Sequence, residues 1–503
     1  MEALLTALPS ALSVESIISV LAGSFIGLVF GSIPGLTFTV ALALVLPMSF
    51  SLDPTPAIGL LLGTYIGGMT GGSVSAILLG IPGTPSAAAT VIDGYQLTKR
   101  GKASLALGTA VIVSVFGGLL SLLVMILSVD FVARMAIKFG PAEIFALVVF
   151  GLSTICGLSG ESMLRGLIAG CIGLMAMTIG LDELEGAQRL TFGFTTMQQG
   201  VNLLVAMIGL FAVPHIIRVI VDYLRGEQVT VSAADVRTEL PSLRDLRKNF
   251  WLMLRCGVLG TGIGAIPGTG GPIAAFLAYD HAKRFSKTPE RFGKGSIEGV
   301  VAPETANNAV TGGAMIPLLS LGIPGDPATA IVLSGLLIHG LIPGPMLFIE
   351  HPVQIYSVYI AIIIAYLAVL VIQVFGIRIF VRVLQVPAHM LAVGIIVMCG
   401  LGAFAIRNSV FDVYTMGVIG LGAYFLMLAR IPVTPVILGL VLGPTLEREF
   451  RTAMILSEGK LDIFYTSPAA IIFFALALSI FVLKGIGVYK KKKQDMQPAT
   501  RGQ

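Results

Sequence analysis

Apolar stretches of about 20 residues recur along this chain and constrain its fold more than any other feature. The clearest are residues 105–128, 144–158, 201–221, 353–374, 391–405, 413–428 and 468–483. An α-helix of this length crosses the hydrocarbon core of a bilayer. Charged residues make up only 12% of the chain, whereas a soluble domain carries about 25%. The pattern therefore predicts a polytopic membrane protein and argues against a soluble one.

Pro-Gly pairs interrupt several of these apolar stretches. They occur in the first half in residues 31–35 (GSIPG) and 80–85 (GIPGTP), and in the second half in residues 264–268 (GAIPG) and 322–327 (GIPGDP). A Thr-Gly-Gly triplet precedes the second motif in each half, at Thr70 and at Thr311. Proline breaks a helix and glycine permits a tight reversal. The matching order predicts an internal repeat built from broken helices.

The basic residues predict how the repeat lies in the membrane. No lysine or arginine precedes Lys99, and we place the cluster at residues 99–102 in the cytoplasm. The apolar stretch 251–279 lies between two basic loops, so we interpret it as a hairpin that re-enters from the cytoplasm and breaks at Pro267. We expect the first hairpin, residues 17–50, to enter from outside, because Asp53 lies about one crossing from Lys99. The prediction is an inverted-topology repeat, as in many secondary transporters.

The predicted fold is an all-α polytopic membrane protein of about 10–12 spans, with two inverted-topology repeats, Pro-Gly-broken helices and re-entrant hairpins. The first repeat is expected in residues 1–222 and the second in residues 251–487. Residues 223–250 form a predicted cytoplasmic linker, and residues 488–503 a basic cytoplasmic tail. The net charge of +5 comes from short loops and this tail, so it does not indicate a nucleic-acid partner.

Polar residues in the second half are candidates for ion coupling. Glu304, Asn307, Asn308 and Thr311 lie between two Pro-Gly breaks in an otherwise apolar stretch. An ionisable residue at membrane depth indicates a functional site, although Glu304 could instead cap a helix at the cytoplasmic interface. Asp326, after the last break, suits either a cation or helix capping.

The ends of the broken helices are candidates for substrate binding. Helix N-termini attract anions, and unwound carbonyl groups can hold Na⁺. The candidate residues are Pro34, Gly35, Thr70, Gly71, Gly72, Ser73, Pro82, Gly83, Thr84, Pro267, Gly268, Thr269, Gly270, Pro324 and Gly325. The alternative is that these residues only kink and pack the helices. No basic residue lies near the centre of either hairpin, which slightly favours Na⁺ over H⁺ as the coupling ion.

Other motifs have simpler interpretations. Asp93-Gly94 near the basic loop predicts a turn. The five histidines and four cysteines show no ligand spacing, so no metal site is expected beyond a possible Na⁺. Thr288 stands where a phosphate-binding loop needs its first glycine, which argues against ATP as the energy source. No HExxH or paired-aspartate motif lies in a span, so an enzyme is not expected. An ion channel with a Pro-Gly filter is the remaining alternative.

Longer segments around these motifs resemble the large membrane subunit (TctA type) of tripartite tricarboxylate transporters. They are residues 31–47 (GSIPGLTFTVALALVLP), 67–90 (GGMTGGSVSAILLGIPGTPSAAAT), 93–95 (DGY), 292–313 (FGKGSIEGVVAPETANNAVTGG) and 439–450 (GLVLGPTLEREF). The resemblance covers nearly the whole chain. It implies a bacterial inner-membrane subunit that works with a small four-span membrane partner (TctB type) and a periplasmic solute-binding protein (TctC type). It further implies uptake of a carboxylate such as citrate, driven by a Na⁺ or H⁺ gradient.

Overall fold

The described chain is almost entirely helical. The computed structural model describes residues 2–34, 36–158, 162–182, 185–225, 238–383 and 388–495. In that part of the chain the strands are β1 (Gly180–Leu181) and β2 (Gln188–Arg189), which pair antiparallel. The chain divides into two compact units, one of Met1–Ile137 with Asn202–Phe425 and one of Lys138–Val201 with Leu426–Gln503.

Seven helices among the described residues are long and apolar enough to cross a membrane. They cover Val14–Ser32, Pro54–Leu79, Ala103–Ala136, Leu203–Leu224, Pro352–Phe380, Met390–Arg407 and Val410–Leu428. Shorter apolar helices cover Phe38–Ser51, Pro141–Thr154, Met163–Met177, Pro327–Ile338 and Pro468–Val482. These helices confirm the predicted all-α polytopic membrane protein. The predicted inversion of the repeats concerns their orientation in a membrane and stays a prediction.

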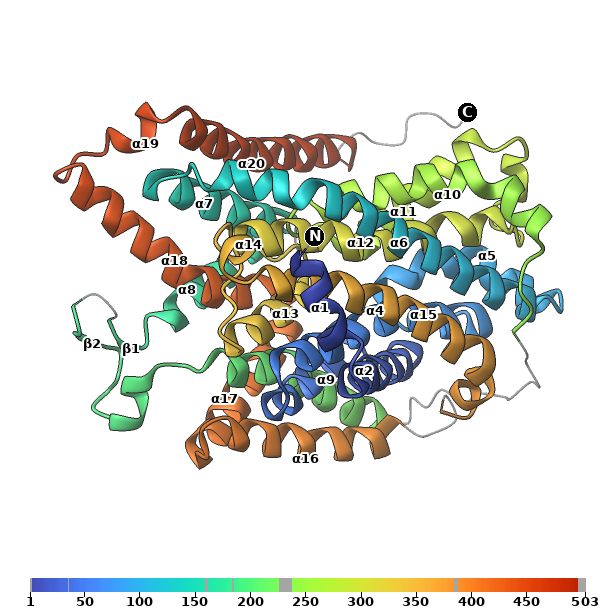
Figure 1. Cartoon of the computed structure of the whole chain (residues 1–503), viewed down its shortest axis with the longest axis horizontal. Helices are drawn as coiled ribbons and strands as arrows, with labels where there is room; N and C mark the ends of the chain where they lie inside the picture. Colours follow the sequence, from blue (N-terminus) through green and yellow to red (C-terminus); the bar gives the residue numbers. More distant parts are fainter. Residues whose placement is uncertain are drawn as a thin grey trace. The chain divides into compact units, whose positions relative to one another are not determined.

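The first unit contains most of the helices, which are labelled in Figure 1. From the first half of the chain come α1 (Glu2–Ala11), α2 (Val14–Ser32), α3 (Phe38–Val45), η1 (Pro47–Ser51), α4 (Pro54–Leu79), η2 (Pro85–Ala87), α5 (Ala88–Lys99), α6 (Ala103–Ala136) and α9 (Leu203–Leu224). From the second half come α10 (Leu243–Gly264), α11 (Gly270–Phe285), η4 (Pro289–Arg291), α12 (Glu298–Leu321), α13 (Pro327–Ile338), α14 (Leu347–Glu350), α15 (Pro352–Val383), α16 (Ala388–Arg407) and most of α17 (Val410–Leu428).

The broken helices follow the same order in both halves. A turn at Pro34 separates α2 from α3, and a turn at Pro267 separates α10 from α11, where the sequence predicts the break. The long helices α4 and α12 both end at a glycine in the left-handed conformation, Gly80 with φ of 72° and Gly322 with φ of 69°. L-residues with a side chain rarely adopt this conformation, so glycine ends both helices at the same step of the motif.

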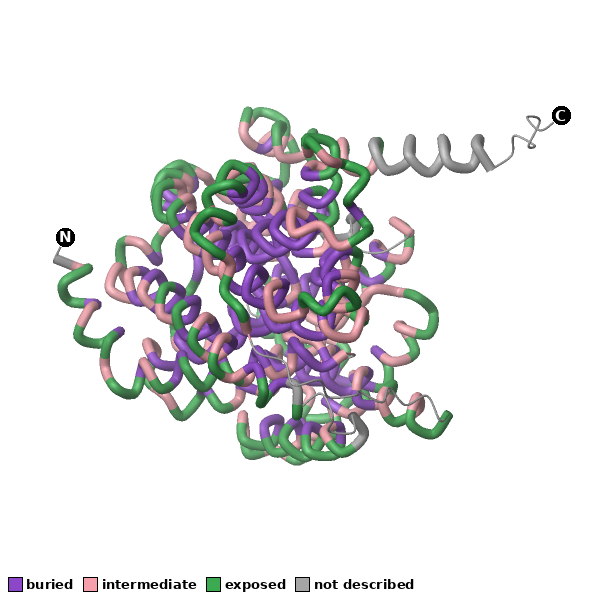
Figure 2. The backbone as a smooth tube through the Cα atoms, turned by 90° about the vertical axis from the view of Figure 1, so that its right-hand side faces the viewer, coloured by how far each residue is buried: buried purple, intermediate pink, exposed green. Residues whose placement is uncertain are grey.

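Helices α4 and α12 form the centre of the first unit. Residues 56–77 of α4 and 299–320 of α12 are all buried, and buried residues are drawn in purple in Figure 2. Glycine lets the neighbouring helices approach closely. A Cβ atom on Gly27 of α2 would lie 2.2 Å from the Thr64 carbonyl oxygen of α4, and one on Gly260 of α10 would lie 2.2 Å from the Ala306 carbonyl oxygen of α12. Both halves therefore pack their central helix through glycine.

The second unit has its own apolar core and a cluster of ion pairs. It comprises α7 (Pro141–Leu158), α8 (Met163–Met177), the two strands, η3 (Thr195–Gln199), α18 (Thr434–Leu456), α19 (Ile463–Thr466) and α20 (Pro468–Asp495). The Phe145 ring packs against Phe450 and Phe464, joining α7 to α18 and α19. Asp182 pairs with Arg189 at 2.8 Å and with Arg451 at 2.9 Å. These pairs tie the strand segment to α18.

Each compact unit combines segments from both halves of the sequence. The predicted boundaries at residues 222, 250 and 487 divide the chain by repeat rather than by compact unit, so they stay a prediction. Part of the predicted linker, residues 226–237, and the end of the predicted tail, residues 496–503, lie outside the described residues.

Candidate functional site

A buried carboxyl group lies on α12, in the first half of that helix. Glu304 is fully buried, and its carboxyl oxygens accept hydrogen bonds from the Thr90 hydroxyl of α5 at 2.5 Å and the Ser114 hydroxyl of α6 at 3.4 Å. No basic side chain in the described part of the chain pairs with it. A charged carboxylate without a counter-ion is costly in an apolar interior. Glu304 is therefore suited to hold a proton or a cation.

Asn308 lies one helical turn beyond Glu304 and extends the polar cluster. Its side-chain oxygen accepts a 2.8 Å hydrogen bond from the Thr70 hydroxyl of α4. Its side-chain nitrogen donates to the Ser114 hydroxyl at 2.8 Å and to the Glu304 carbonyl oxygen at 3.2 Å. Ser114 thus contacts both candidate residues. The cluster joins the Thr-Gly-Gly segment of the first half to the central helix of the second.

Thr311 and Tyr366 close the cluster on its other side. The Thr311 hydroxyl donates to the Asn308 carbonyl oxygen at 2.6 Å and also lies 2.6 Å from the Tyr366 hydroxyl. The Tyr366 hydroxyl donates to the same carbonyl oxygen at 3.1 Å. Each hydroxyl has one proton, so two of these three contacts are hydrogen bonds at any time, and each arrangement keeps the Asn308 carbonyl oxygen paired.

Asn307 presents a buried oxygen that has no partner. Its side-chain nitrogen donates to the Met69 carbonyl oxygen at 3.3 Å, whereas its Oδ1 atom makes no hydrogen bond with any described residue. A Cβ atom on Gly271 would lie 2.5 Å from this oxygen and 2.8 Å from Ser86 Cβ. The oxygen therefore lies where α12, α11 and η2 meet. A buried acceptor without a partner is uncommon and is suited to a ligand.

Asp326 occupies the N-cap of α13. One carboxyl oxygen accepts a hydrogen bond from the Thr329 backbone nitrogen at 2.8 Å, completing a capping box. The other accepts a 2.7 Å hydrogen bond from the Tyr65 hydroxyl of α4. This geometry matches helix capping, the second of the two roles predicted for Asp326. The residue also links α13 to the central helix of the first half.

Most of the predicted substrate-binding residues lie in the breaks between helices. This group comprises Pro34, Pro82, Gly83, Thr84, Pro267, Gly268, Thr269, Pro324 and Gly325. Gly270 begins α11, and Gly35 lies outside the described residues.

The predicted residues at positions 70–73 lie inside α4 instead, and packing occupies several of their groups. The Ser73 hydroxyl donates to the Thr70 carbonyl oxygen at 2.7 Å. A Cβ atom on Gly71 would lie 2.6 Å from the Leu28 carbonyl oxygen of α2, and one on Gly72 would lie 2.2 Å from the Thr84 hydroxyl oxygen. These two glycines therefore allow close packing, as the alternative interpretation predicts.

The two breaks of each half lie next to each other. The Gly268 backbone nitrogen donates to the Gly325 carbonyl oxygen at 2.7 Å. In the first half, a Cβ atom on Gly83 would lie 2.0 Å from the Gly31 carbonyl oxygen. Thr84 occupies the N-cap of η2, but its hydroxyl lies 3.1 Å from the Ser86 hydroxyl and caps no backbone nitrogen. Each half thus brings its two helix breaks together at one place.

The predicted turn at Asp93-Gly94 is wrong. Asp93 lies inside α5 and is buried, and its carboxylate accepts hydrogen bonds from three backbone nitrogens, those of Gly293 at 3.1 Å, Gly295 at 2.7 Å and Ser296 at 2.8 Å. The Tyr279 hydroxyl donates a fourth at 2.8 Å. The helix continues through Gly94 because this carboxylate finds its partners on a distant loop rather than in its own backbone.

Sequence reasoning did not identify several residues of the site. Tyr65, Thr90, Ser114 and Tyr366 each contact a predicted residue through a hydroxyl group. The one signal in the sequence for these four residues is a lone hydroxyl group within an apolar segment. Many such hydroxyls bond to their own helix instead, so this signal alone does not select the partners.

The fold and the cluster define a class of protein. Apolar helices long enough to span a membrane accompany broken helices, and a carboxyl and two amide groups lie buried among them. This combination is typical of a polytopic membrane transport protein. Residues 17–438 match the tripartite tricarboxylate transporter TctA family, and the chain belongs to this family. Membership points to a transporter rather than an enzyme.

Two relatives from Agrobacterium vitis are similar to the chain. One, described as an uncharacterized 52.8 kDa protein in the TAR-I ttuC' 3' region, is 35% identical over 487 residues, which cover 97% of this chain and 96% of the relative. The other, described as an uncharacterized protein in the TAR-II ttuC' 3' region, is 35% identical over 237 residues. These cover 47% of this chain and 98% of that relative.

Proposed function

We propose that this chain is the substrate-translocating subunit of a secondary uptake system for di- or tricarboxylates, which an ion gradient drives and a binding protein supplies. Its family supports a tripartite system, in which a small membrane subunit (TctB type) and a periplasmic solute-binding protein (TctC type) are the partners. The proposed location is the bacterial inner membrane, with the basic tail in the cytoplasm. The observation that carries the proposal is the buried Glu304–Asn308 cluster, which lacks a cationic partner among the described residues.

The coupling ion is proposed to bind at this cluster. Glu304 provides a carboxyl group and Asn307 provides an unpaired amide oxygen, and both are buried. Oxygen ligands of this kind suit Na⁺, and the carboxyl group alone suits H⁺. Asp326 already bonds to Thr329 and Tyr65, so we assign it to positioning α13 rather than to the ion. In the sequence, no basic residue lies near the breaks to hold an anionic substrate. A bound Na⁺ beside the cluster would supply that positive charge, which favours Na⁺ as the coupling ion.

The carboxylate substrate is proposed to bind at the helix breaks. The N-terminal end of α11 approaches η2, which leads directly into α5: a Cβ atom on Gly271 would lie 2.8 Å from Ser86 Cβ. Free backbone N–H groups at the beginning of a helix attract anions. Thr84 and Ser86 add hydroxyl donors beside them. The substrate would then be held by helix ends, hydroxyl groups and the coupling ion, because the sequence has no basic residue at the breaks to hold it.

Uptake by vesicles that contain the three components tests the proposal. We expect an imposed Na⁺ or H⁺ gradient to drive citrate uptake only when the binding protein is present. Glu304→Gln and Asn308→Ala should each lower this uptake about tenfold or more, because each removes a buried group worth roughly 1.5–3 kcal/mol to its partners. Glu350→Gln changes an exposed carboxylate outside the cluster and serves as the matched control. Equal uptake and equal ion dependence in all three variants would refute the assignment.

A further inference from the structure

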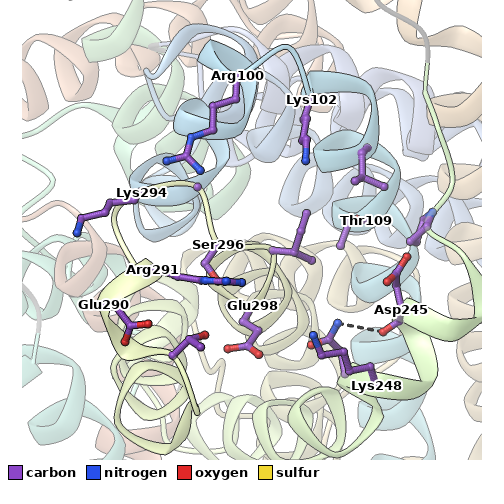
Figure 3. Close-up of a pocket in the computed structure, with 16 residues that line it drawn as sticks. Arg100, Lys102, Thr109, Asp245, Lys248, Glu290, Arg291, Lys294, Ser296 and Glu298 are labelled. Carbon is purple, nitrogen blue, oxygen red and sulfur yellow. Dashed lines mark hydrogen bonds between the residues drawn. The ribbon is translucent and has the colours of Figure 1, made fainter.

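A cavity of about 660 Å³ lies within the first unit, beside the loops that carry its basic residues. The loop before α6, the beginning of α10 and the segment that leads into α12 form its walls (Figure 3). Five cationic side chains line it: Arg100, Lys102, Lys248, Arg291 and Lys294. Three acidic side chains accompany them: Asp245, Glu290 and Glu298. The excess of positive charge favours an anionic ligand, and the volume lies in the usual range for a small-molecule site.

The cations of this cavity are free to bind a ligand. Within the described residues, none of the five makes an ion pair or a side-chain hydrogen bond. Two of the carboxylates, in contrast, already accept hydrogen bonds of 2.6 Å, Asp245 from Ser242 and Glu298 from Ser286. In Figure 3 Lys102 and Arg291 reach the space from opposite walls. An anion in the cavity would therefore face cations from two walls.

A buried hydroxyl in the wall of the cavity also lacks a partner. Thr109 of α6 is only 2% exposed, and its Oγ1 atom makes no hydrogen bond with any described residue. Most threonines in these helices donate to a carbonyl oxygen of the preceding turn, as Thr305 does to Val301 at 2.6 Å. A buried donor left unpaired costs stability. An oxyanion in the cavity would supply the missing acceptor.

Two helices connect this cavity to the polar cluster. On α6, Thr109 lines the cavity and Ser114 contacts Glu304 five residues later, a rise of about 7.5 Å. On α12, Glu298 lines the cavity and Glu304 follows six residues later, a rise of about 9 Å. Helices α6 and α12 pack against each other along this path. The cavity therefore lies one to two helical turns from the proposed ion site, on the side of the basic loops.

We propose that this cavity, which we call the basic cavity, binds a small multivalent carboxylate and is the site that a transported anion occupies before it leaves on the side of the basic loops. The identification of the ligand as a transported carboxylate rests on the proposed function. Inorganic phosphate shares the required chemistry, so the test must separate the two anions. Lysine and arginine would act here by charge and hydrogen bonding, in contrast to the helix ends and hydroxyls proposed at the helix breaks.

Calorimetric titration of the full chain, purified in detergent, with citrate and separately with inorganic phosphate tests this proposal. We expect citrate to bind, and the double variant Lys102→Gln, Arg291→Gln to bind it about tenfold more weakly, since each partly exposed charge pair contributes only a few-fold. Thr109→Val, which removes the hydroxyl and keeps the shape, should weaken binding a few-fold. Glu290→Gln should strengthen it, because it removes a repelling charge. Lys287→Gln, an exposed lysine of the same loop that does not line the cavity, should leave binding unchanged.

Some results would overturn the proposal. Citrate affinity that is the same in the double variant, in Thr109→Val and in Lys287→Gln would show that the basic cavity does not bind it. Phosphate binding that depends on Lys102 and Arg291, without citrate binding, would reject a carboxylate as the ligand. A melting temperature equal to that of the unchanged chain shows that each variant is folded. Failure of the vesicles to take up any di- or tricarboxylate would refute the proposed function, yet would leave this binding measurement intact, so the two failures are distinguishable.

Discussion

The Thr70 hydroxyl donates a 2.8 Å hydrogen bond to the side-chain oxygen of Asn308, across 238 positions of sequence. Both residues are fully buried, on the central helices of the two halves. Thr70→Val should leave the Asn308 oxygen unpaired and lower the free energy of unfolding by about 1–3 kcal/mol. It should also reduce citrate uptake. Thermal melting in detergent and vesicle uptake measure the two effects. Thr64→Val on the same helix is the control, because among the described residues the Thr64 hydroxyl bonds only to the Leu60 carbonyl oxygen of its own helix. Equal effects at both positions would contradict a special role for the Thr70–Asn308 pair.

Asp93 should hold the loop that leads into α12. Asp93→Asn replaces an acceptor of four hydrogen bonds with a side chain that keeps a single oxygen. We expect a loss of about 2–4 kcal/mol in stability and faster cleavage by trypsin at Arg291 and Lys294. Limited proteolysis followed by mass spectrometry measures the cleavage. Asp280→Asn is the control, since Asp280 pairs with Arg284 on the exposed surface. If trypsin cuts the loop no faster in Asp93→Asn than in Asp280→Asn, Asp93 does not hold the loop in place.

Two glycines on α10 should respond in opposite ways to alanine. A Cβ atom on Gly260 would lie 2.2 Å from the Ala306 carbonyl oxygen, whereas a Cβ atom on Gly262 would meet no atom within 4 Å. Gly260→Ala should therefore destabilise the chain by roughly 1–3 kcal/mol, because the packed helix must shift. Gly262→Ala should stabilise it by up to about 1 kcal/mol, because alanine favours the helix. Thermal melting of the two variants compares them directly, and equal shifts would contradict the packing of α10 on α12.

Asp182 should fix the strand segment of the second unit to α18. It is 6% exposed and pairs with Arg189 and Arg451, and its hydrogen bond raises the pKa of the Arg451 guanidinium. Arginine is protonated throughout the usual pH range in any case, so this cation remains available to Asp182. Asp182→Asn should speed amide hydrogen exchange at residues 180–182 and 185–189 about tenfold or more. Glu185→Gln is the control, because Glu185 is 73% exposed and lies 3.8 Å from Arg451. Unchanged exchange in Asp182→Asn would refute this role.

The inverted repeat predicts labelling from opposite sides of the membrane. Asp53 precedes α4 and Lys287 follows α11, and both residues are exposed. Asp53→Cys should react with an impermeant maleimide added outside intact cells, and Lys287→Cys only after the cytoplasmic face is opened. Cys171 is exposed, so the labelling background carries Cys171→Ser. Reaction of both cysteines from the same side would show that the two halves are not inverted.

Local chemistry made the helix breaks predictable, because proline and glycine act on the backbone where they stand. The ends of α4 and α12 at Gly80 and Gly322 follow from the sequence for this reason. The apolar stretches likewise indicated membrane helices. The candidate residues Glu304 and Asn308 could be selected because polar groups are rare in such segments. Their partners could not, since Thr90 and Ser114 lie 214 and 190 positions away from Glu304.

The sequence by itself determined that this protein is a predominantly helical membrane protein with breaks at the Ile-Pro-Gly motifs, since helix length and backbone freedom depend on neighbouring residues. Only the tertiary structure decided which polar groups meet. Asp93 lies in a helix rather than a turn because its partners, the backbone nitrogens of Gly293, Gly295 and Ser296, come from a loop about 200 positions away. Asn307 keeps an unpaired oxygen because no donor among the described residues reaches it where α12, α11 and η2 meet. Contacts of this kind depend on how distant helices pack, which local sequence does not specify.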